Sequence, residues 1–201
     1  MAYKHGVYNT EQATSLTVPI QGSAGLQVIF GTAPIHLAKD PAAAVNTPKL
    51  VYSYKEAVEA VGYSDDFENF TLCQSIDANF RVFNNAPIIL VNVLDPSNSK
   101  HTKSNEEESC TVANGQAVYT KPYVLLDTLV VKKDATPLVA ETDYTAAHDD
   151  DGSVVITLIS ETAKEAESLS VSSTSLNPAG VTKEDVVGGV DTATGKETGL
   201  E

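Results

Sequence analysis

Residues 26–38, LQVIFGTAPIHLA, and residues 86–96, APIILVNVLDP, are the two apolar runs that decide the fold. Short apolar runs bounded by turn residues are typical of buried strands. Gly31 and Pro34 kink the first run, because glycine and proline disturb strand pairing, and Asp95-Pro96 ends the second. The two runs therefore predict two buried strands in one lobe, the first over residues 26–37.

Two helices are predicted between these strands. Ser53 and Glu56 form a capping-box pattern, and they introduce the segment KEAVEAVG, which ends at Gly62. Large apolar residues then recur at helical intervals and predict an amphipathic helix over residues 71–84, with this stripe in the core: Phe67, Phe70, Leu72, Ile76, Phe80 and Phe83. Residues 26–96 therefore describe an open α/β lobe whose strands need further partners.

The second half of the chain has a different period. SNSKHTKSNEEES, residues 97–109, is polar and of mixed charge, which predicts a linker. Beyond it the pattern repeats every two residues in short runs separated by acidic turns, which is typical of a small β-sandwich. The predicted strands lie at residues 117–119, 123–126, 128–132, 142–146, 153–159 and 169–172.

These patterns predict an α+β protein made of four parts. An extended N-terminal arm (1–20) precedes a partial α/β core lobe (21–97), which is followed by an inserted small antiparallel β-sandwich domain (98–188). Residues 189–201 then begin a further α/β domain. The arm mixes polar and aromatic residues without a period, so it is either disordered or adds itself as a strand to the sheet edge of another chain.

Composition and charge exclude several function classes. The formal net charge is −14, with 18 acids against 7 bases in residues 101–201 and Arg81 as the single arginine. Such a surface repels phosphate backbones and anionic membranes, so no nucleic-acid and no membrane partner is expected. No apolar run approaches the ~18 residues of a membrane span. Cys73 and Cys110 have dissimilar contexts and predict free thiols in a reducing cytoplasm.

The motifs do not predict catalysis, a cofactor or a metal. Asp149-Asp150-Asp151-Gly152 lacks both ends of a calcium-binding loop and is interpreted as a hairpin turn. The histidines are scattered without metal-binding spacing: His5, His36, His101 and His148. No GxSxG elbow and no phosphate-binding loop occurs. We therefore expect that the protein is not an enzyme.

Several consecutive segments resemble the N-terminal part of contractile-tail sheath proteins from bacteriophages, prophages and phage-tail-like bacteriocins of Gram-positive hosts. They are MAYKHGVYNTEQATS, VIFGTAPIHLA, VYSYKEAVEAVGYSDDFENFTLCQSI and APIILVNVLDP. LVAETDYTAAHDDDGSVVITL is similar to the family's β-sandwich domain, and VVGGVDTATGKETGLE to the start of its next, larger domain. The resemblance implies that the chain is an N-terminal fragment of a sheath subunit.

The resemblance also implies a mechanical role. Sheath subunits form hexameric rings that stack in a helical sleeve around the tail tube protein above the baseplate, and contraction drives the tube through the target envelope. The energy is stored in the lattice, so no ATP site is expected. The implied location is the virion, with assembly in the host cytoplasm. Extended arms tie neighbouring subunits together, which assigns Tyr3, Val7, Tyr8 and Leu16 to inter-subunit contacts.

A second hypothesis is a carbohydrate- or receptor-binding module. In this interpretation the β-sandwich presents a ligand face, which requires exposed aromatic residues on one sheet. The candidates are Tyr119, Tyr123 and Tyr144, although tyrosines at such positions more often pack in a core or at an edge.

Overall fold

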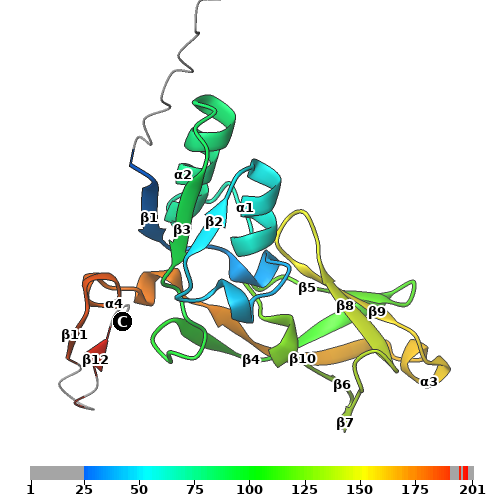
Figure 1. Ribbon diagram of the computed structural model, residues 1–201. Coiled ribbons are helices and arrows are strands. Elements are labelled where there is room, and N and C mark those ends of the chain that lie inside the picture. Colours follow the sequence, from blue (N-terminus) through cyan, green and yellow to red (C-terminus); the bar gives the residue numbers. More distant parts are fainter. Residues whose placement is uncertain (1–24, 191–194, 196, 199–201) are drawn as a thin grey trace, which may run out of the picture.

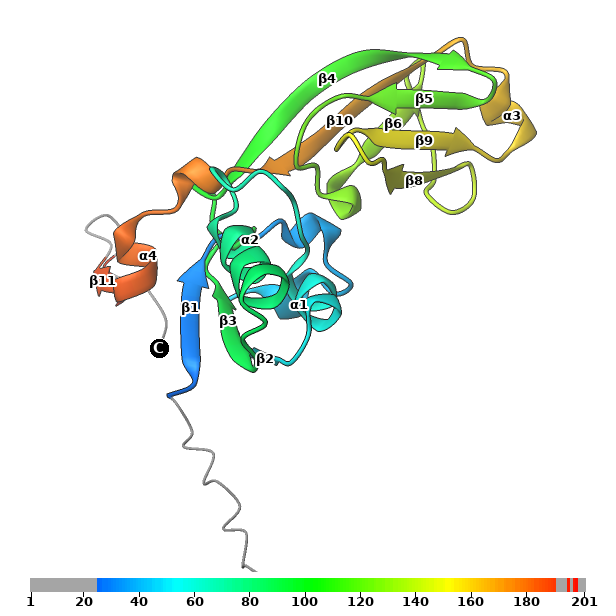
Figure 2. The ribbon, with the colours of Figure 1, turned by 90° about the horizontal axis from the view of Figure 1, so that it is seen from above.

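The computed structural model describes residues 25–190, 195 and 197–198, and these form two lobes (Figure 1). The first lobe has a three-stranded sheet with helices packed on one side, and the second has a larger, curled sheet of seven strands. Figure 2 shows the second lobe projecting away from the first. The predicted α+β class, with an antiparallel lobe following an α/β lobe, is confirmed.

The two apolar runs form neighbouring strands of the first sheet. β1 (Gln27–Gly31) pairs in parallel with β3 (Ile88–Asn92), and β2 (Lys49–Val51) pairs with the other side of β3 in the antiparallel direction. The strand predicted over residues 26–37 is too long, because β1 ends at Gly31 and Ile35–Leu37 forms a 3-10 turn. Pro34, which precedes that turn, has no backbone N–H to continue a ladder.

The first predicted helix is confirmed at both ends. α1 spans Tyr54–Val61, and the side chain of Ser53 accepts a hydrogen bond from the backbone N–H of Glu56 at 3.3 Å. The Glu56 carboxylate accepts from the backbone N–H of Tyr52 at 2.8 Å, one residue before the expected capping-box donor. Gly62 ends the helix at φ +78°, where a Cβ would lie 2.3 Å from the carbonyl oxygen of Pro34.

The second predicted helix has two parts. α2 (Thr71–Ile76) continues directly as a π-helical segment, η3 (Asp77–Val82). Phe70, Leu72 and Ile76 are fully buried in the core of the first lobe, as the apolar stripe predicts. Phe83 does not belong to this core: it follows the last helical turn and is 75% exposed.

The second lobe is one hydrogen-bonded series of strands in the order β7-β6-β10-β4-β5-β9-β8. All of its strand pairs are antiparallel. Side chains from β6 and β9, which are not neighbours in the series, share one buried cluster, so the sheet curls around its own core. The strands are β4 (Thr102–Ala113), β5 (Gln116–Tyr119), β6 (Val130–Lys133), β7 (Thr136–Pro137), β8 (Tyr144–His148), β9 (Val154–Leu158) and β10 (Ser168–Leu176).

The predicted linker at residues 97–109 is wrong for most of its length. Residues from Thr102 onward belong to β4, the longest strand, which pairs with β10 on one side and β5 on the other. Its side chains are mostly solvated, and Cys110, at 6% exposure, is the one that is buried. The run is polar because this strand contributes backbone hydrogen bonds rather than apolar side chains to the lobe.

The structure confirms one predicted turn of the second lobe and corrects one predicted strand. The Asp149–Gly152 hairpin is confirmed: it joins β8 to β9, and Gly152 has φ +84°. The strand predicted over residues 123–126 is wrong, because Tyr123 has φ +57° and only Val124 forms an isolated bridge, to Ser175. A 3-10 turn, η4 (Leu126–Thr128), follows.

The lobes meet where the chain crosses between them. Leu125 and Leu176, from the second lobe, complete the core of the first. The backbone N–H of Asn177 donates to the carbonyl oxygen of His101 at 2.7 Å, which ties the returning chain to the outgoing one. Smaller elements complete the described residues: η2 (Ala42–Ala44), α3 (Glu161–Lys164), η5 (Pro178–Gly180), α4 (Lys183–Val187), β11 (Gly189–Val190) and β12 (Glu197–Thr198).

Candidate interaction surfaces

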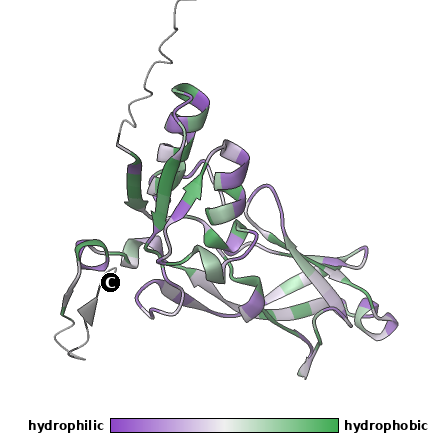
Figure 3. Ribbon diagram, in the orientation of Figure 1, coloured by the Kyte–Doolittle hydropathy of each residue, from purple (hydrophilic) through white to green (hydrophobic). Residues whose placement is uncertain are grey.

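The three-stranded sheet has an outer face that carries apolar side chains. Val28, Ile89 and Leu50 lie in one register row across β1, β3 and β2. Val28 and Leu50 are each 47% exposed, and Phe30 on β1 is exposed to the same extent. Figure 3 shows that β1 and β3 are among the most hydrophobic elements of the lobe. We call Val28, Phe30, Leu50 and Ile89 the outer sheet face.

The opposite face of this sheet carries the core. Ile88, Leu90 and Val51 are buried there, and they belong to the same cluster as residues of α1 and α2. Because successive side chains of a strand point to opposite faces, helices on one side leave the alternate residues of β1 uncovered. The prediction that the first apolar run is a buried strand is therefore wrong for one of its two faces.

β1 is also an edge strand. In the described part of the chain, β1 pairs only with β3, so its other side has no partner strand. A strand edge of this kind is a template for pairing with an additional strand. The predicted arm residues Tyr3, Val7, Tyr8 and Leu16 lie outside the described residues.

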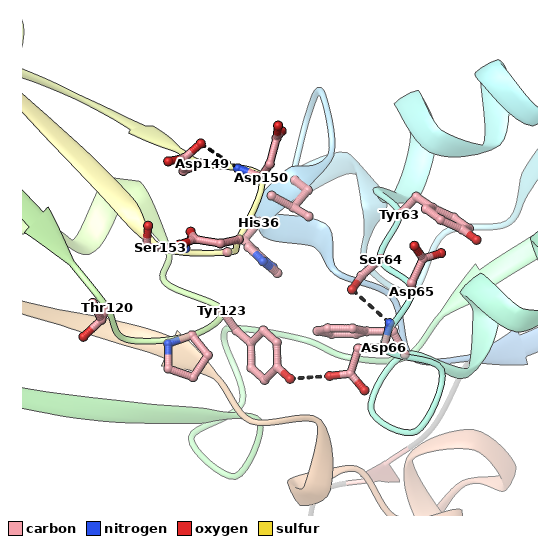
Figure 4. A pocket seen from close by; sticks show the side chains of 15 residues that line it. His36, Tyr63, Ser64, Asp65, Asp66, Thr120, Tyr123, Asp149, Asp150 and Ser153 are labelled. Atoms are coloured by element: carbon pink, nitrogen blue, oxygen red, sulfur yellow. Dashed lines mark hydrogen bonds between the residues drawn. The ribbon is translucent and has the colours of Figure 1, made fainter.

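A second surface feature is a cleft of about 610 Å³ between the lobes (Figure 4). Tyr123, from the second lobe, donates its hydroxyl proton to the Asp66 carboxylate of the first, and the amide of Asn69 donates to both groups. The ring of Phe70 meets the Tyr123 ring edge-on with the centroids 5.0 Å apart. These contacts fasten one lobe to the other at the floor of the cleft.

Burial and hydrogen bonding determine the protonation states of Tyr123 and Asp66. Burial and the bond to Asp66 raise the pKa of Tyr123 to about 12. Burial alone would raise the pKa of Asp66, but the hydrogen bonds from Tyr123 and Asn69 outweigh it, and the net shift is downward. The pair is therefore a neutral phenol and a carboxylate at neutral pH, with the phenol as donor.

The cleft walls are acidic. Five aspartates line it, and no lysine or arginine is among the lining residues: Asp65, Asp66, Asp149, Asp150 and Asp151. Two of these carboxylates accept bonds within their own turn, from the backbone N–H groups of Asp150 and Ser153. Within residues 25–190, no group of three or more histidine, cysteine, aspartate or glutamate side chains could hold a metal ion. The cleft therefore disfavours anions and offers no assembled metal site.

The structure brings together two histidines that the sequence does not connect. His36 and His148 are 5.1 Å apart between ring centroids, although they come from different lobes. His101 lies instead at the lobe crossing, with its Nε2 atom 3.5 Å from a carboxylate oxygen of Asp185. Nothing in the local spacing of the histidines indicates either arrangement, because each depends on the long-range fold. His5 lies outside the described residues.

The tyrosines proposed for a ligand face do not form one. Tyr119 is fully buried and Tyr144 is 4% exposed, both within the core of the second lobe. Tyr123 is half-buried, and its hydroxyl is hydrogen-bonded to Asp66. An aromatic carbohydrate-binding face at these three residues is therefore ruled out by their burial and contacts.

Comparison with known proteins does not identify a family. No protein-family model, no curated protein and no solved structure matches the chain.

Cys73 and Cys110 are both free and buried, as predicted. Among the described residues, no helix has both the length and the apolar character needed to cross a membrane.

Proposed function

We propose that the chain is part of a structural subunit of a contractile tail sheath, with a mechanical rather than a catalytic role. The resemblance of its consecutive segments to that family is the starting point. The observation that carries the proposal is the outer sheet face, an apolar surface next to an unpaired strand edge. The proposed partners are other sheath subunits, the tail tube protein and the baseplate.

The outer sheet face fits a neighbouring copy of the chain. Burying apolar surface contributes about 25 cal/mol per Å², and the exposed side chains of Val28, Phe30 and Leu50 leave part of this contribution unused. The edge of β1 supplies unpaired backbone groups beside the apolar face. An extended arm that adds a strand uses both features, since its backbone pairs with the edge while its alternate side chains pack beside Val28 and Phe30 on the same face. We assign this role to residues 3–17 of the neighbouring subunit.

The second lobe suits an outward position on the sleeve. It projects from the first lobe, and the half of the chain that contains it carries most of the negative charge. A strongly acidic outer surface keeps an assembly soluble and limits non-specific adhesion. The proposed virion location follows from this role.

Immunogold electron microscopy tests the proposed function. Antibodies raised against the whole chain are applied to particles released from the bacterium that encodes it. Label distributed along the full length of contractile sleeves is the expected result. Label confined to fibres or to the baseplate would support a receptor-binding module instead, and particles with unlabelled sleeves would refute the sheath assignment.

Val28→Glu is expected to prevent sleeve assembly while leaving the fold of the subunit intact. The substitution places a charge on the outer sheet face, next to the unpaired strand edge, where it would be buried on assembly without a partner. Val118→Glu on β5 is the matched control, because Val118 is 51% exposed and Val28 is 47% exposed. Sleeves are counted by negative-stain microscopy. Normal sleeves from the Val28 variant, or equal loss with the control, would contradict the assignment.

Deletion of residues 1–15 from the encoded protein is expected to abolish sleeve assembly or contraction. The arm is proposed to act on a neighbouring subunit, so its removal should leave the thermal unfolding of the subunit itself nearly unchanged. Microscopy of the sleeves and a melting curve of the purified subunit measure the two effects separately. Normal contractile sleeves from the deletion would show that the arm is dispensable.

A further inference from the structure

The pair formed by His36 and His148 is a contact between the β8–β9 hairpin and the first lobe. His36 lies in the 3-10 turn Ile35–Leu37, and His148 is the last residue of β8. Their rings meet at an interplanar angle of 75°. Phe70 and Tyr123 flank the His36 ring, at centroid distances of 6.1 and 5.9 Å. The acidic turn of the hairpin begins at the next residue and forms one wall of the cleft (Figure 4).

Three of the four ring nitrogens of this pair are buried without hydrogen-bond partners. The Nδ1 atom of His36 and both ring nitrogens of His148 have no hydrogen-bond partner. Buried polar atoms are normally hydrogen-bonded, so this arrangement requires an explanation. A neutral imidazole tolerates it at modest cost, whereas an imidazolium presents two N–H donors and a full charge that need acceptors.

The charged groups around the pair do not supply those acceptors. On the first lobe, Asp66 already accepts from Tyr123 and Asn69. On the hairpin, Asp149 accepts from the backbone N–H of Asp150, and Asp151 accepts from that of Ser153. Asp65 and Asp150 line the cleft as exposed residues, without a hydrogen bond to either ring. No lysine or arginine lines the cleft.

We propose that His36 and His148 form a proton-sensitive junction, which holds the β8–β9 hairpin against the first lobe while both rings are neutral and releases it when either ring gains a proton. The first proton would place a charge among buried aromatic rings. A second would place two like charges in rings whose centroids are 5.1 Å apart. Opening of the hairpin hydrates both rings and removes this penalty. This inference does not depend on the sheath assignment.

The direction of the pKa shifts agrees with this arrangement. Burial, and then the proximity of His148, lower the pKa of His36 from 6.5 to about 3, and burial lowers the pKa of His148. A hydrated histidine keeps a pKa near 6.5. The open state therefore binds more protons below that pH, so docking weakens as the pH falls from about 6.5 toward about 3. Docking is unaffected above this window.

A single tryptophan reporter tests the junction, because the chain has no tryptophan of its own. Leu37→Trp places the reporter in the cleft beside His36, at an exposed position. We expect its emission to shift to longer wavelength as the pH is lowered from about 7.5 to about 4. Adding His148→Phe, which keeps a ring but cannot titrate, should move the midpoint at least about one pH unit lower, a tenfold change in proton concentration.

Asp150→Asn in the same reporter background is the matched control for the carboxylates of the hairpin, and it should leave the midpoint unchanged. A reporter that does not respond over this range, or a His148→Phe variant with the original midpoint, would overturn the proposal. Nuclear magnetic resonance of the unmodified chain gives a test that does not depend on any variant folding. The imidazole resonances of His36 and His148 should titrate well below 6.5, and titration near 6.5 would also overturn it.

Discussion

Replacing Asn92 by alanine is expected to lower the free energy of unfolding by about 4 kcal/mol. Asn92 lies at the end of β3 and is fully buried. Its side-chain oxygen accepts from the backbone N–H groups of Ala33 and Leu94, at 3.0 and 3.1 Å. Its amide nitrogen donates to the carbonyl oxygens of Ala44 and Leu94, at 3.3 and 3.1 Å. One side chain thus satisfies backbone groups from three segments.

The size of this effect follows from the lack of alternative partners. Ala33, Ala44 and Leu94 are all buried, so their backbone groups cannot turn to bulk water when the amide is removed. Each unsatisfied buried group costs about 1–3 kcal/mol. For a domain of this length, a loss of about 4 kcal/mol corresponds to a fall in the melting temperature of about 10 °C.

Asn105→Ala is the matched control for this prediction. The Asn105 amide is half-buried and donates to the hydroxyls of Ser173 and Ser175, at 3.0 and 2.7 Å. The two hydroxyls are the acceptors in these bonds, and they can still donate to other groups. Ser173 also keeps the Tyr119 hydroxyl as a partner at 3.1 Å, so the same substitution should cost about 1 kcal/mol. Thermal or urea unfolding measures both variants. Equal losses for the two asparagines would show that Asn92 is not the organising residue of the first lobe.

The sequence predicts the structure well where the signals are local. The start of α1 depends on Ser53 and Glu56, which lie within one helical turn of each other, and the structure has this cap. The hairpin at Asp149–Gly152 likewise depends on consecutive residues. Both predictions succeed because the backbone hydrogen bonds that determine these features are formed by neighbours in the sequence.

The sequence does not predict features that depend on which distant segments pair with or pack against an element. The polar run that begins at Thr102 forms β4 because β5 and β10 pair with it. Nothing in the residues of the run itself indicates this pairing. The alternate residues of β1 are exposed because the helices cover one side of the sheet. Asn92 was part of an apolar run, and its role depends on where Ala33 and Ala44 lie in the fold. The outer sheet face and the cleft between the lobes could not be predicted from the sequence for the same reason.

Replacing Gly180 by alanine is expected to destabilise the crossing between the lobes by about 3 kcal/mol. A Cβ at this position would lie 1.8 Å from the carbonyl oxygen of Lys100 and 2.7 Å from its carbonyl carbon. These are backbone atoms, so the clash cannot be relieved by turning a side chain. The outgoing and returning chains must therefore separate. The hydrogen bond from the side-chain amide of Asn177 to the carbonyl oxygen of Lys100, 2.9 Å long, is then strained or lost.

Trypsin gives a local readout of this separation, because the carbonyl group involved belongs to the peptide bond after Lys100. Cleavage at Lys100 should accelerate about a hundredfold in the Gly180 variant, the factor that about 3 kcal/mol of local opening provides. Cleavage at Lys55, which is exposed on α1, should stay unchanged and serves as the internal reference. Gly25→Ala is the matched variant, since a Cβ there meets no atom within 4 Å. If the two glycine variants are cleaved at Lys100 at the same rate, close packing at Gly180 does not hold the lobes together.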